Sequence, residues 1–329
     1  MSIPEINKTD CIVIGAGISG LLAGRELERR GVEYLILDKG RGLGGRMATR
    51  RIGDSRFDHG AQFVTAKTPE FMELIDECIE AGAAVKWSDG VRTESGETME
   101  PRPYYRGTDG MTRIAKYFAD GLEYRLSTKI TSLSVQNDIW TLVSESGSEF
   151  SAPSLIVTMP APQALDLFDN SAVALEDDVM SRLRQIEYDP CIAAMITLDN
   201  PSTIPPPGAL RLSAEPVSWI SDNFAKGISP DGYGVTVHCG PVFSRDNYNT
   251  DDERIAEMII DNVSRLLGCT PLACRIHRWK YSRARKTLAD RCLSATRPAR
   301  IVFAGDGFGS GNIEAAALSG VEAAELVTS

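Results

Sequence analysis

The sequence lacks the features that would place a protein in a membrane or in an oxidising compartment. No apolar run approaches the ~20 residues that cross a bilayer, and the first nine residues are too short and polar for a signal peptide. The seven cysteines are odd in number and include no Cys-x-x-Cys pair, which argues against a disulfide framework and a zinc site. We therefore expect a cytoplasmic protein with reduced thiols, no metal and no membrane partner.

Positive charge and histidine are scarce as well. The chain has 35 Lys and Arg against 45 Asp and Glu, a formal net charge of -10, and only three histidines. Because nucleic-acid binding depends on neutralising phosphates with Lys and Arg, we expect no nucleic-acid partner. The 329 residues exceed the ~250 to 300 at which a single core stops growing, so two lobes are expected.

A glycine-rich turn follows the first predicted strand. Residues 10–20, DCIVIGAGISG, run from apolar residues into a G-x-G-x-x-G pattern and then into a helical segment. The first glycine permits a tight turn, the second lets a diphosphate approach the backbone, and the third lets the helix pack on the strand. The helix N-terminus then offers its unpaired amides to the phosphates. The predicted cofactor contacts here are Gly15, Ala16, Gly17, Ile18, Ser19 and Gly20.

The next two segments support a dinucleotide site. VEYLILD is typical of a strand, and it ends at Asp38, where a carboxylate can bind a ribose diol. Residues 39–51 hold five basic residues, beginning with Lys39, and no acidic one, which indicates an anionic ligand. A plain glycine turn and a solvated basic loop remain the alternatives.

Later segments return to the same lobe. Residues 123–147 alternate in polarity around an Asn137-Asp138 turn, as in a β-meander. LIVTMPAPQAL predicts a buried strand that ends at Pro160, and RIVFAGD predicts a strand that leads into a helix with Asn312 as its N-cap.

The remaining segments predict a second lobe of helices and antiparallel strands. Residues 68–82 and 250–268 have helical periodicity, and the second helix begins with a capping box of Thr250 and Glu253. Short alternating runs such as CIAAMITLD and GVTVHC are separated by Pro and Gly, as an antiparallel sheet requires.

Several strings together resemble the renalase-like flavin oxidases of the amine-oxidase-like superfamily. They are DKGRGLGGRMATR, DHGAQF, LIVTMPAPQAL, ISDN, HRWKYS and AGDGFGSGN, and the likeness spans the whole chain. It implies an α/β fold like that of amine oxidases and p-hydroxybenzoate hydroxylase. A Rossmann-type FAD-binding domain would comprise residues 1–65, 108–165 and 292–329, and an inserted α+β substrate domain would comprise residues 66–107 and 166–291.

The resemblance also implies an enzyme activity. Non-covalently bound FAD would accept hydride from dihydronicotinamide dinucleotides reduced at the 2- or 6-position, and dioxygen would take the electrons, giving NAD(P)+ and hydrogen peroxide. Loss of hydride creates an aromatic pyridinium, so no general base is needed. Cys292 lies well before Asp306, so no cysteine is placed for covalent attachment at the C-terminal flavin motif.

The candidate site residues follow from the same strings and their neighbours. Further cofactor contacts would be Gly45, Arg46, Gln62, Ile130, Asp306 and Ile313. We expect the substrate in the cleft between the lobes, against Asp58, His59, Gly60, Ala61, Tyr105, Arg106, Gly107, Trp219, Asn223, His238, Trp279 and Asn312. His277, Trp279 and Tyr281 share one strand face and could form an aromatic wall, whereas Lys280 points away from it.

Alternatives stay open at two levels. His238 could equally be a core histidine, and the aromatic wall could be a core face. For the whole protein, the rivals are a flavin amine or amino-acid oxidase and a flavin-free escort protein on the same fold.

Overall fold

Two compact, interleaved units make up the chain. The structure, a computed structural model, describes residues 7–99, 101–171 and 173–329. Unit 1 comprises Met1–Gly45, Ala115–Tyr188 and Ala284–Ser329, and unit 2 comprises Arg46–Ile114 and Asp189–Arg283. The predicted lobes are interleaved too, with different bounds. Residues 46–65 and 108–114, which the sequence assigns to the first lobe, belong to unit 2, and residues 166–188 and 284–291 belong to unit 1.

Unit 1 is built on a six-stranded sheet in the order β10-β3-β2-β14-β21-β20. Every neighbouring pair is parallel except β20 with β21. The central strands are short and fully buried, as expected for a parallel sheet covered on both faces. The strands are β2 (Cys11–Ile14), β3 (Tyr34–Leu37), β10 (Tyr124–Arg125), β14 (Ser154–Val157), β20 (Leu293–Ala295) and β21 (Arg300–Phe303).

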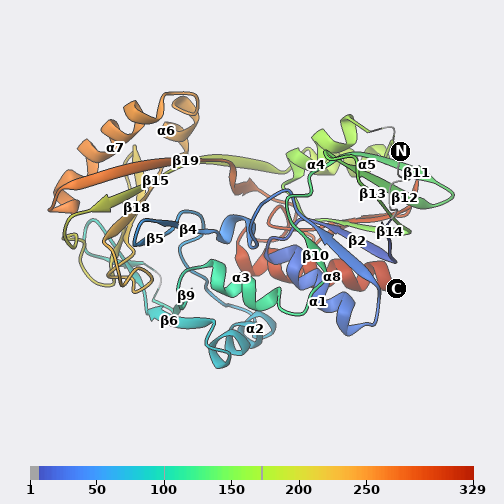
Figure 1. The fold of residues 1–329 in the computed structure, drawn as a ribbon, viewed down its shortest axis with the longest axis horizontal. Coiled ribbons are helices and arrows are strands. Elements are labelled where there is room, and N and C mark those ends of the chain that lie inside the picture. The colour runs from blue at the N-terminus through green and yellow to red at the C-terminus, as the bar shows by residue number, and fades with distance from the viewer. Residues whose placement is uncertain (1–6, 100, 172) are drawn as a thin grey trace. The chain divides into compact units, whose positions relative to one another are not determined.

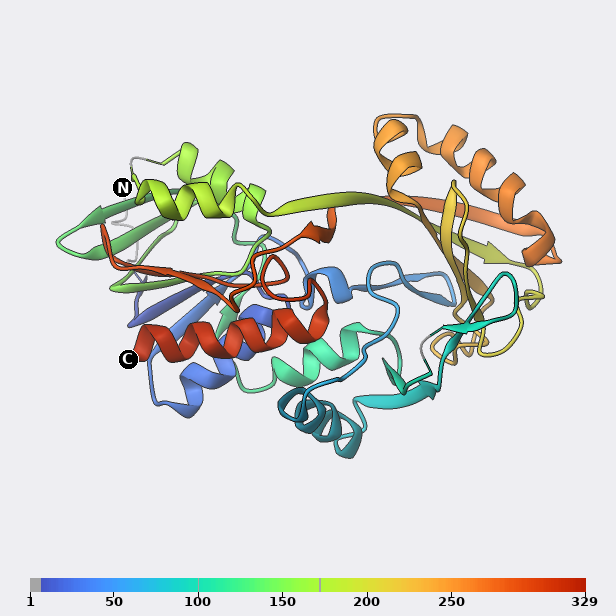
Figure 2. The same ribbon diagram turned by 180° about the vertical axis from the view of Figure 1, so that it is seen from behind.

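Different layers cover the two faces of this sheet. Helices α1 (Ile18–Arg29) and α8 (Ile313–Thr328) lie side by side on one face (Figures 1 and 2). Their approach depends on Gly320, since a Cβ there would lie 1.9 Å from the Ser19 carbonyl oxygen. The other face packs on a meander sheet and two short helices, in a core that contains Trp140 and Phe168. These elements are β1 (Asn7–Lys8), β11 (Ile130–Gln136), β12 (Ile139–Ser144), β13 (Glu149–Ala152), α4 (Ala161–Asp169) and α5 (Asp177–Leu183).

The sequence predicts most of unit 1 and misplaces one strand end. The meander is confirmed: β11 and β12 are antiparallel, and Asn137 and Asp138 take the positive φ values, 53° and 61°, of a two-residue hairpin. The predicted strand ending at Pro160 is wrong at its end, because β14 stops at Val157. There Thr158 turns the chain by donating its hydroxyl to the Ile14 and Gly15 carbonyls, and Pro160 precedes α4.

Unit 2 is built on a seven-stranded sheet in the order β19-β15-β18-β17-β16-β7-β8. Helix α7 (Asp252–Leu267) and the short α6 (Pro241–Asp246) cover one face, where Ile259 and Val263 pack against Val235 and Val237. Figure 2 shows α7 lying along this sheet. The strands are β7 (Val91–Thr93), β8 (Thr98–Met99), β15 (Glu187–Leu198), β16 (Ala209–Arg211), β17 (Val217–Asp222), β18 (Gly234–Cys239) and β19 (Pro271–Lys286).

The capping box predicted for α7 is wrong. Asp251, not Thr250, is the N-cap, and its carboxylate accepts a hydrogen bond from the Glu253 amide at 2.8 Å. The Thr250 hydroxyl instead faces Asn247. Both residue types cap well, so the pattern alone does not choose between neighbours.

A hairpin packs on the opposite face of the sheet. Strands β4 (Thr49–Ile52) and β5 (Ser55–Asp58) pair antiparallel, and a Cβ at Gly234 would lie 2.6 Å from the Phe57 ring. Glycine at 234 therefore lets the hairpin lie directly on β18. The other elements of unit 2 are β6 (Ala84–Ser88), paired with β9 (Tyr104–Gly107), helix α2 (Pro69–Glu80) and the start of α3 (Thr112–Phe118). In the described part of the chain, no helix has both the length and the apolar character of a membrane span.

Candidate active site

The G-x-G-x-x-G turn in unit 1 has the geometry of an anion cradle. Gly15 takes a φ of 115°, and a Cβ at Gly20 would lie 1.8 Å from the Gly15 carbonyl oxygen. Gly17 is the N-cap of α1, with no side-chain cap and open space where a Cβ would stand. Nearby, the buried Ser19 hydroxyl has no hydrogen-bond partner in the described structure. The first turn of α1 thus offers free polar groups to a phosphate.

A second glycine pair joins this cradle. Gly44 and Gly45 take φ values of 94° and 53°, and the Gly44 amide donates to the Ala16 carbonyl at 2.9 Å. The β-bridge between Gly17 and Gly44 holds the second glycine loop against the first. Lys39, from the same basic stretch, donates to Gln163 on α4 at 2.7 Å.

Four candidate groups follow the carboxyl ends of neighbouring parallel strands. Gly15 follows β2, Asp38 follows β3, Thr158 follows β14, and Asp306 lies shortly after β21. The Asp38 carboxylate accepts from the Ala16 and Gly40 amides at 2.6 and 2.5 Å, which leaves lone pairs for a ribose diol. In open α/β sheets, this edge is where dinucleotides bind.

The C-terminal part of unit 1 also agrees with the sequence. Asn312 caps α8, as predicted, by accepting from the Ala315 amide at 2.8 Å, and Ile313 is the first residue of that helix. The buried Asp306 carboxylate accepts from the Tyr188 hydroxyl at 3.1 Å. Ile130 has a core side chain and pairs with Ser144, so only its main chain remains for the predicted cofactor contact.

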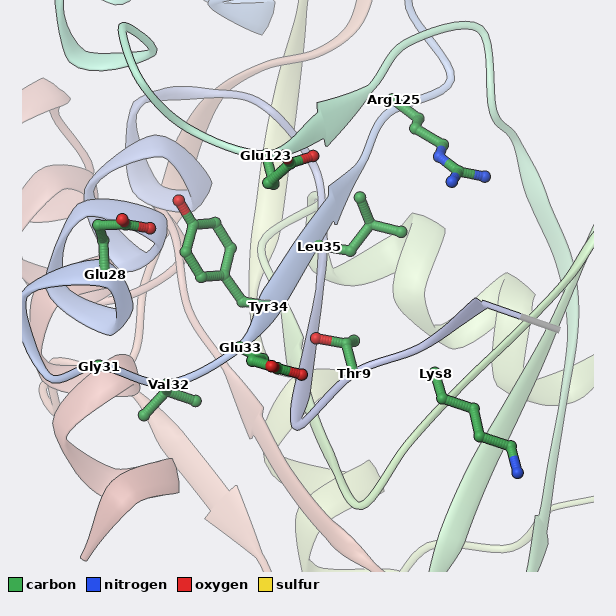
Figure 3. A pocket seen from close by; sticks show the side chains of 10 residues that line it. All are labelled: Lys8, Thr9, Glu28, Gly31, Val32, Glu33, Tyr34, Leu35, Glu123 and Arg125. Atoms are coloured by element: carbon green, nitrogen blue, oxygen red, sulfur yellow. The ribbon is translucent and has the colours of Figure 1, made fainter.

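A cavity of about 610 Å³ opens at the other edge of this sheet (Figure 3). Tyr34 begins β3 and Glu123 directly precedes β10, so the cavity lies at the amino ends of the strands. Its lining has three carboxylates, those of Glu28, Glu33 and Glu123, against two basic side chains, Lys8 and Arg125. Position and charge both disfavour a dinucleotide diphosphate there.

In unit 2 the DHGAQF turn is fixed to the polar face of the sheet. The His59 carbonyl accepts from the Trp279 indole at 2.8 Å and lies 3.2 Å from His238 Nε2. The Gln62 side chain accepts from the Ser221 hydroxyl at 2.7 Å. A Cβ at Gly60 would lie 2.0 Å from the Arg46 carbonyl oxygen, so glycine is required by the protein's own packing.

All three histidines of the chain gather at this turn. The His59 ring stacks on Trp279 with centroids 5.3 Å apart and planes 25° apart, and His277 meets both rings edge-on, at 4.9 and 4.3 Å. Burial lowers the pKa of His59 and of His238 to about 4 in each case, and it also lowers the pKa of His277. The three rings are therefore neutral at pH 7.

Beneath the turn lies a buried ion pair that the sequence did not reveal. Lys226 Nζ is 2.7 Å from Asp58 Oδ2, and neither side chain is exposed. The other Asp58 oxygen accepts from the Thr49 hydroxyl at 2.6 Å and the Met111 amide at 2.8 Å. Asp58 is a predicted substrate contact, and its carboxylate is fully buried in bonds to these protein groups. No pattern in the sequence links a lone lysine after ISDN to an aspartate 168 positions earlier.

An aromatic cluster adjoins this pair and was also missed. Phe63 packs against Tyr104, Trp219 and Trp87 at centroid distances of 4.6, 5.6 and 6.4 Å. Lys226 Nζ lies 5.4 Å from the centre of the Trp87 ring. Only Trp219 was a candidate from the sequence, and its buried indole N–H has no partner in the described structure.

The remaining predicted residues of unit 2 make mainly internal contacts. The Arg106 guanidinium donates to the Gly107 and Thr108 carbonyls, and Tyr105 lies on β9 with its hydroxyl toward Met72. Asn223 is fully buried and donates to Gly234 and Thr236, with its Oδ1 unpaired in the described structure. The polar groups of these side chains are therefore used mainly within the protein.

The predicted contacts in and near the DHGAQF turn are bonded internally too. The Gln62 amide donates to the Gly60 carbonyl, and the Ala61 amide donates to the Arg46 carbonyl. Arg46 itself donates to the Tyr281 and Ser282 carbonyls.

Comparisons with known proteins agree with this arrangement. The family model for flavin containing amine oxidoreductase matches residues 88–328, and a model for an NAD(P)-binding Rossmann-like domain matches residues 13–78. Renalase from Mus musculus is 25% identical over 324 residues, which cover 92% of this chain and 93% of that protein.

Two solved structures show the same fold at low sequence identity. A double mutant of putrescine oxidase has a TM-score of 0.72 at 13% identity, covering 98% of this chain and 99% of that one. A putative protoporphyrinogen oxidase from Exiguobacterium sp. 255-15 has a TM-score of 0.73 at 14% identity, covering 98% of both chains. The predicted fold, a Rossmann-type domain combined with an α+β domain, is confirmed.

Proposed function

The chain belongs to the family of flavin-containing amine oxidoreductases, and from that premise we propose that it is an FAD-dependent oxidase of dihydronicotinamide dinucleotides. Its substrate would be reduced at the 2- or 6-position of the pyridine ring. The similarity to renalase over nearly the whole chain supports this assignment. The overall reaction takes the dihydronicotinamide, dioxygen and a proton to NAD(P)+ and hydrogen peroxide.

The groups of unit 1 fit FAD. The uncapped start of α1, the orphaned Ser19 hydroxyl and the open space at Gly17 suit a diphosphate, and Asp38 suits a ribose diol. When bound, FAD would supply a two-electron acceptor that dioxygen can reoxidise. Burial raises the pKa of the Cys292 thiol to about 12, and this thiol faces Glu322. An unreactive thiol supports non-covalent binding.

The charge of unit 2 is the observation that carries the substrate class. Lys226 neutralises Asp58. Burial, and to a smaller extent the charge of Arg106, lowers the pKa of Lys226, and the charge of Arg50 acts on His59 and His277. Positive groups thus exceed negative ones around the turn. A protonated amine would be repelled there, whereas the diphosphate of a dinucleotide would be attracted.

For hydride transfer these residues need to orient the donor ring, and they need not act as a general base. Loss of hydride turns the dihydropyridine into an aromatic pyridinium, and no base must remove a second proton. His59 and His238 are neutral near pH 7, so neither adds a positive charge against the developing pyridinium. The stacked His59 and Trp279 rings offer a flat surface to the donor ring, and the bond from Trp279 to the His59 carbonyl fixes that surface.

Anaerobic titration of the purified, flavin-loaded protein tests the proposal. We expect stoichiometric bleaching of the flavin absorbance by 2- or 6-dihydro-NAD(P), and peroxide release once air is admitted. Ordinary 4-dihydro-NAD(P) and amines such as putrescine should react far more slowly. Bleaching by amines alone would show an amine oxidase instead. A colourless protein that does not take up added FAD would favour an escort protein.

An amine oxidase is the second candidate because of the aromatic cluster. Phe63, Tyr104 and Trp219 could bind an apolar amine in its neutral form. The fixed ammonium of Lys226 above Trp87 speaks against a cationic one.

A further inference from the structure

Three arginines of the basic stretch 39–51, Arg41, Arg50 and Arg51, are exposed and make no hydrogen bond or ion pair in the described structure. Lys39 bonds Gln163, and Arg46 bonds two main-chain carbonyls of β19. Of the three exposed arginines, only Arg50 is among the charges that act on His59 and His277.

Arg50 lies beside the rings of His59, His277 and Trp279, which we call the wall. It pairs with Phe57 in the β4–β5 hairpin, and the Phe57 ring faces β18. Cross-strand partners point to the same face of a hairpin, so Arg50 projects on the side of the sheet. Its charge reaches His59 and His277, whose pKa values it helps to lower.

The wall itself can receive a flat ring. Trp279 and His277 are only partly buried, and the Trp279 ring is held against His59 by stacking and by its hydrogen bond to the main chain. In a nicotinamide dinucleotide, one ribose separates the pyridine ring from the diphosphate, so a ring stacked on this wall would place its diphosphate nearby. A flexible, unpaired guanidinium next to the wall suits that group, because it can bind phosphate oxygens in a bidentate manner.

We propose that Arg50 binds the diphosphate of the dinucleotide substrate and thereby selects dinucleotides over the corresponding nucleoside. The inference rests on the proposed function and adds a specificity-determining residue to it. Arg50 acts on binding, and it takes no part in the transfer of hydride.

The neighbouring arginine provides a matched control. Arg51 follows Arg50 on the same strand and is also exposed, so alternation sends its side chain to the opposite face of the hairpin. It contributes to the pKa of none of the three histidines. Arg50→Ala and Arg51→Ala remove the same charge from the same hairpin, so a difference between them reports position and not net charge.

Two measurements test the inference. The Kd of the product NAD+ should rise about 10- to 100-fold in Arg50→Ala, as expected for the loss of a charge-assisted contact, and stay near wild type in Arg51→Ala. The KM for the 2- or 6-dihydro dinucleotide should rise by a similar factor at nearly unchanged kcat. The KM for the matching dihydronicotinamide riboside, which has no phosphate, should not change. Arg50→Lys should recover part of the loss, because lysine keeps the positive charge but cannot donate two parallel hydrogen bonds as a guanidinium does.

The outcomes separate this inference from the proposed function. If wild type oxidises the dinucleotide while Arg50→Ala behaves like Arg51→Ala, Arg50 is a solvated surface residue and the inference is overturned. An equal KM rise for dinucleotide and riboside would also overturn it, because the effect would then be structural. If wild type oxidises neither compound, the proposed function itself fails.

Discussion

At the scale of single residues, the buried Asp58–Lys226 ion pair connects the DHGAQF turn to the sheet of unit 2. Both side chains have lost their hydration, so each charge depends on the other. Asp58 ends β5 and directly precedes His59, and Lys226 follows the strand that carries Trp219 and Ser221. The pair therefore ties the turn to the sheet.

Removing one partner should be far more costly than removing both. We expect Lys226→Met to lower the free energy of unfolding by ~3–5 kcal/mol, because a buried carboxylate is left uncompensated. The double variant Asp58→Asn/Lys226→Met should recover a large part of this loss. Lys129→Met, which breaks the exposed pair with Glu145, should cost less than ~1 kcal/mol. Urea denaturation measures all three, and similar losses for Lys226→Met and Lys129→Met would contradict the expectation.

Two of the three histidines, His59 and His238, allow a direct test of the buried site. In the folded protein, His59 and His238 should stay neutral down to about pH 4, since burial disfavours their charged forms. The unfolded chain binds protons near pH 6.5, so their contribution to stability is complete above that pH and is lost as the pH falls toward 4. Proton NMR of the ring signals against pH checks this prediction.

The pH dependence of the free energy of unfolding gives an independent check on these pKa values. Each histidine can add at most ~1.4 kcal/mol per pH unit to the decline of the free energy of unfolding below pH 6.5. His238→Gln should make that decline shallower, whatever its effect at pH 7. Titration of either ring near pH 6.5 in the folded protein would show that the site is open to water.

Residue roles were harder to predict than residue positions. His59, Gly60, His238 and Trp279 do come together, because strand alternation and the DHGAQF string carried that information. Their partners did not follow, since Lys226 and Ser221 meet the turn only through tertiary packing. Sequence periodicity reports the face of a strand and is silent on which distant residue meets it.

At the scale of elements, two glycines of unit 1 have separable tasks. A methyl group at Gly17 meets open space, whereas one at Gly320 meets the Ser19 carbonyl. We expect Gly17→Ala to leave the stability of the FAD-free protein within ~0.5 kcal/mol and to weaken FAD binding, because the methyl group enters the phosphate site. Gly320→Ala should destabilise the protein by ~1–3 kcal/mol by forcing α1 and α8 apart.

Fluorescence titration with FAD and chemical denaturation of the FAD-free variants distinguish the two tasks. Loss of stability in FAD-free Gly17→Ala would contradict the open space at this position, and unchanged FAD binding would show that Gly17 does not line the phosphate site. Unchanged stability in Gly320→Ala would mean that the two helices can separate without cost.

Element types were predicted better than element ends. The strand, glycine turn and helix of residues 10–29 and the hairpin at Asn137-Asp138 each have a local cause in the sequence. The end of β14 at Val157 and the choice of Asp251 as the cap of α7 each depend on the hydrogen bonds of one side chain. Such bonds decide between neighbouring residues that have similar propensities.

At the scale of the whole molecule, an interleaved two-unit organisation could be predicted but its borders could not. Parallel strands from three distant segments meet in one sheet, and the order β3-β2-β14-β21 follows from crossover connections between buried strands. Residues 46–65 carry flavin-family strings and yet pack within unit 2. A sequence motif that resembles those of flavin-binding proteins therefore does not determine the unit in which its residues pack.

The same organisation makes a last prediction about cofactor and stability. The proposed FAD cradle comprises residues 15–20, 38–45, 158 and 306, which reach unit 1 from three separate chain segments, so bound FAD would hold these segments together. Ligand that binds only the folded state stabilises it by ~2.7 kcal/mol at a concentration 100 times its Kd, which raises Tm by several degrees for a chain of this size. Differential scanning fluorimetry with increasing FAD should show a concentration-dependent rise that is reduced in Gly17→Ala. Because no covalent bond is expected, heat-denatured protein should release all of its flavin into the supernatant, and flavin retained in the pellet after washing in denaturant would contradict this.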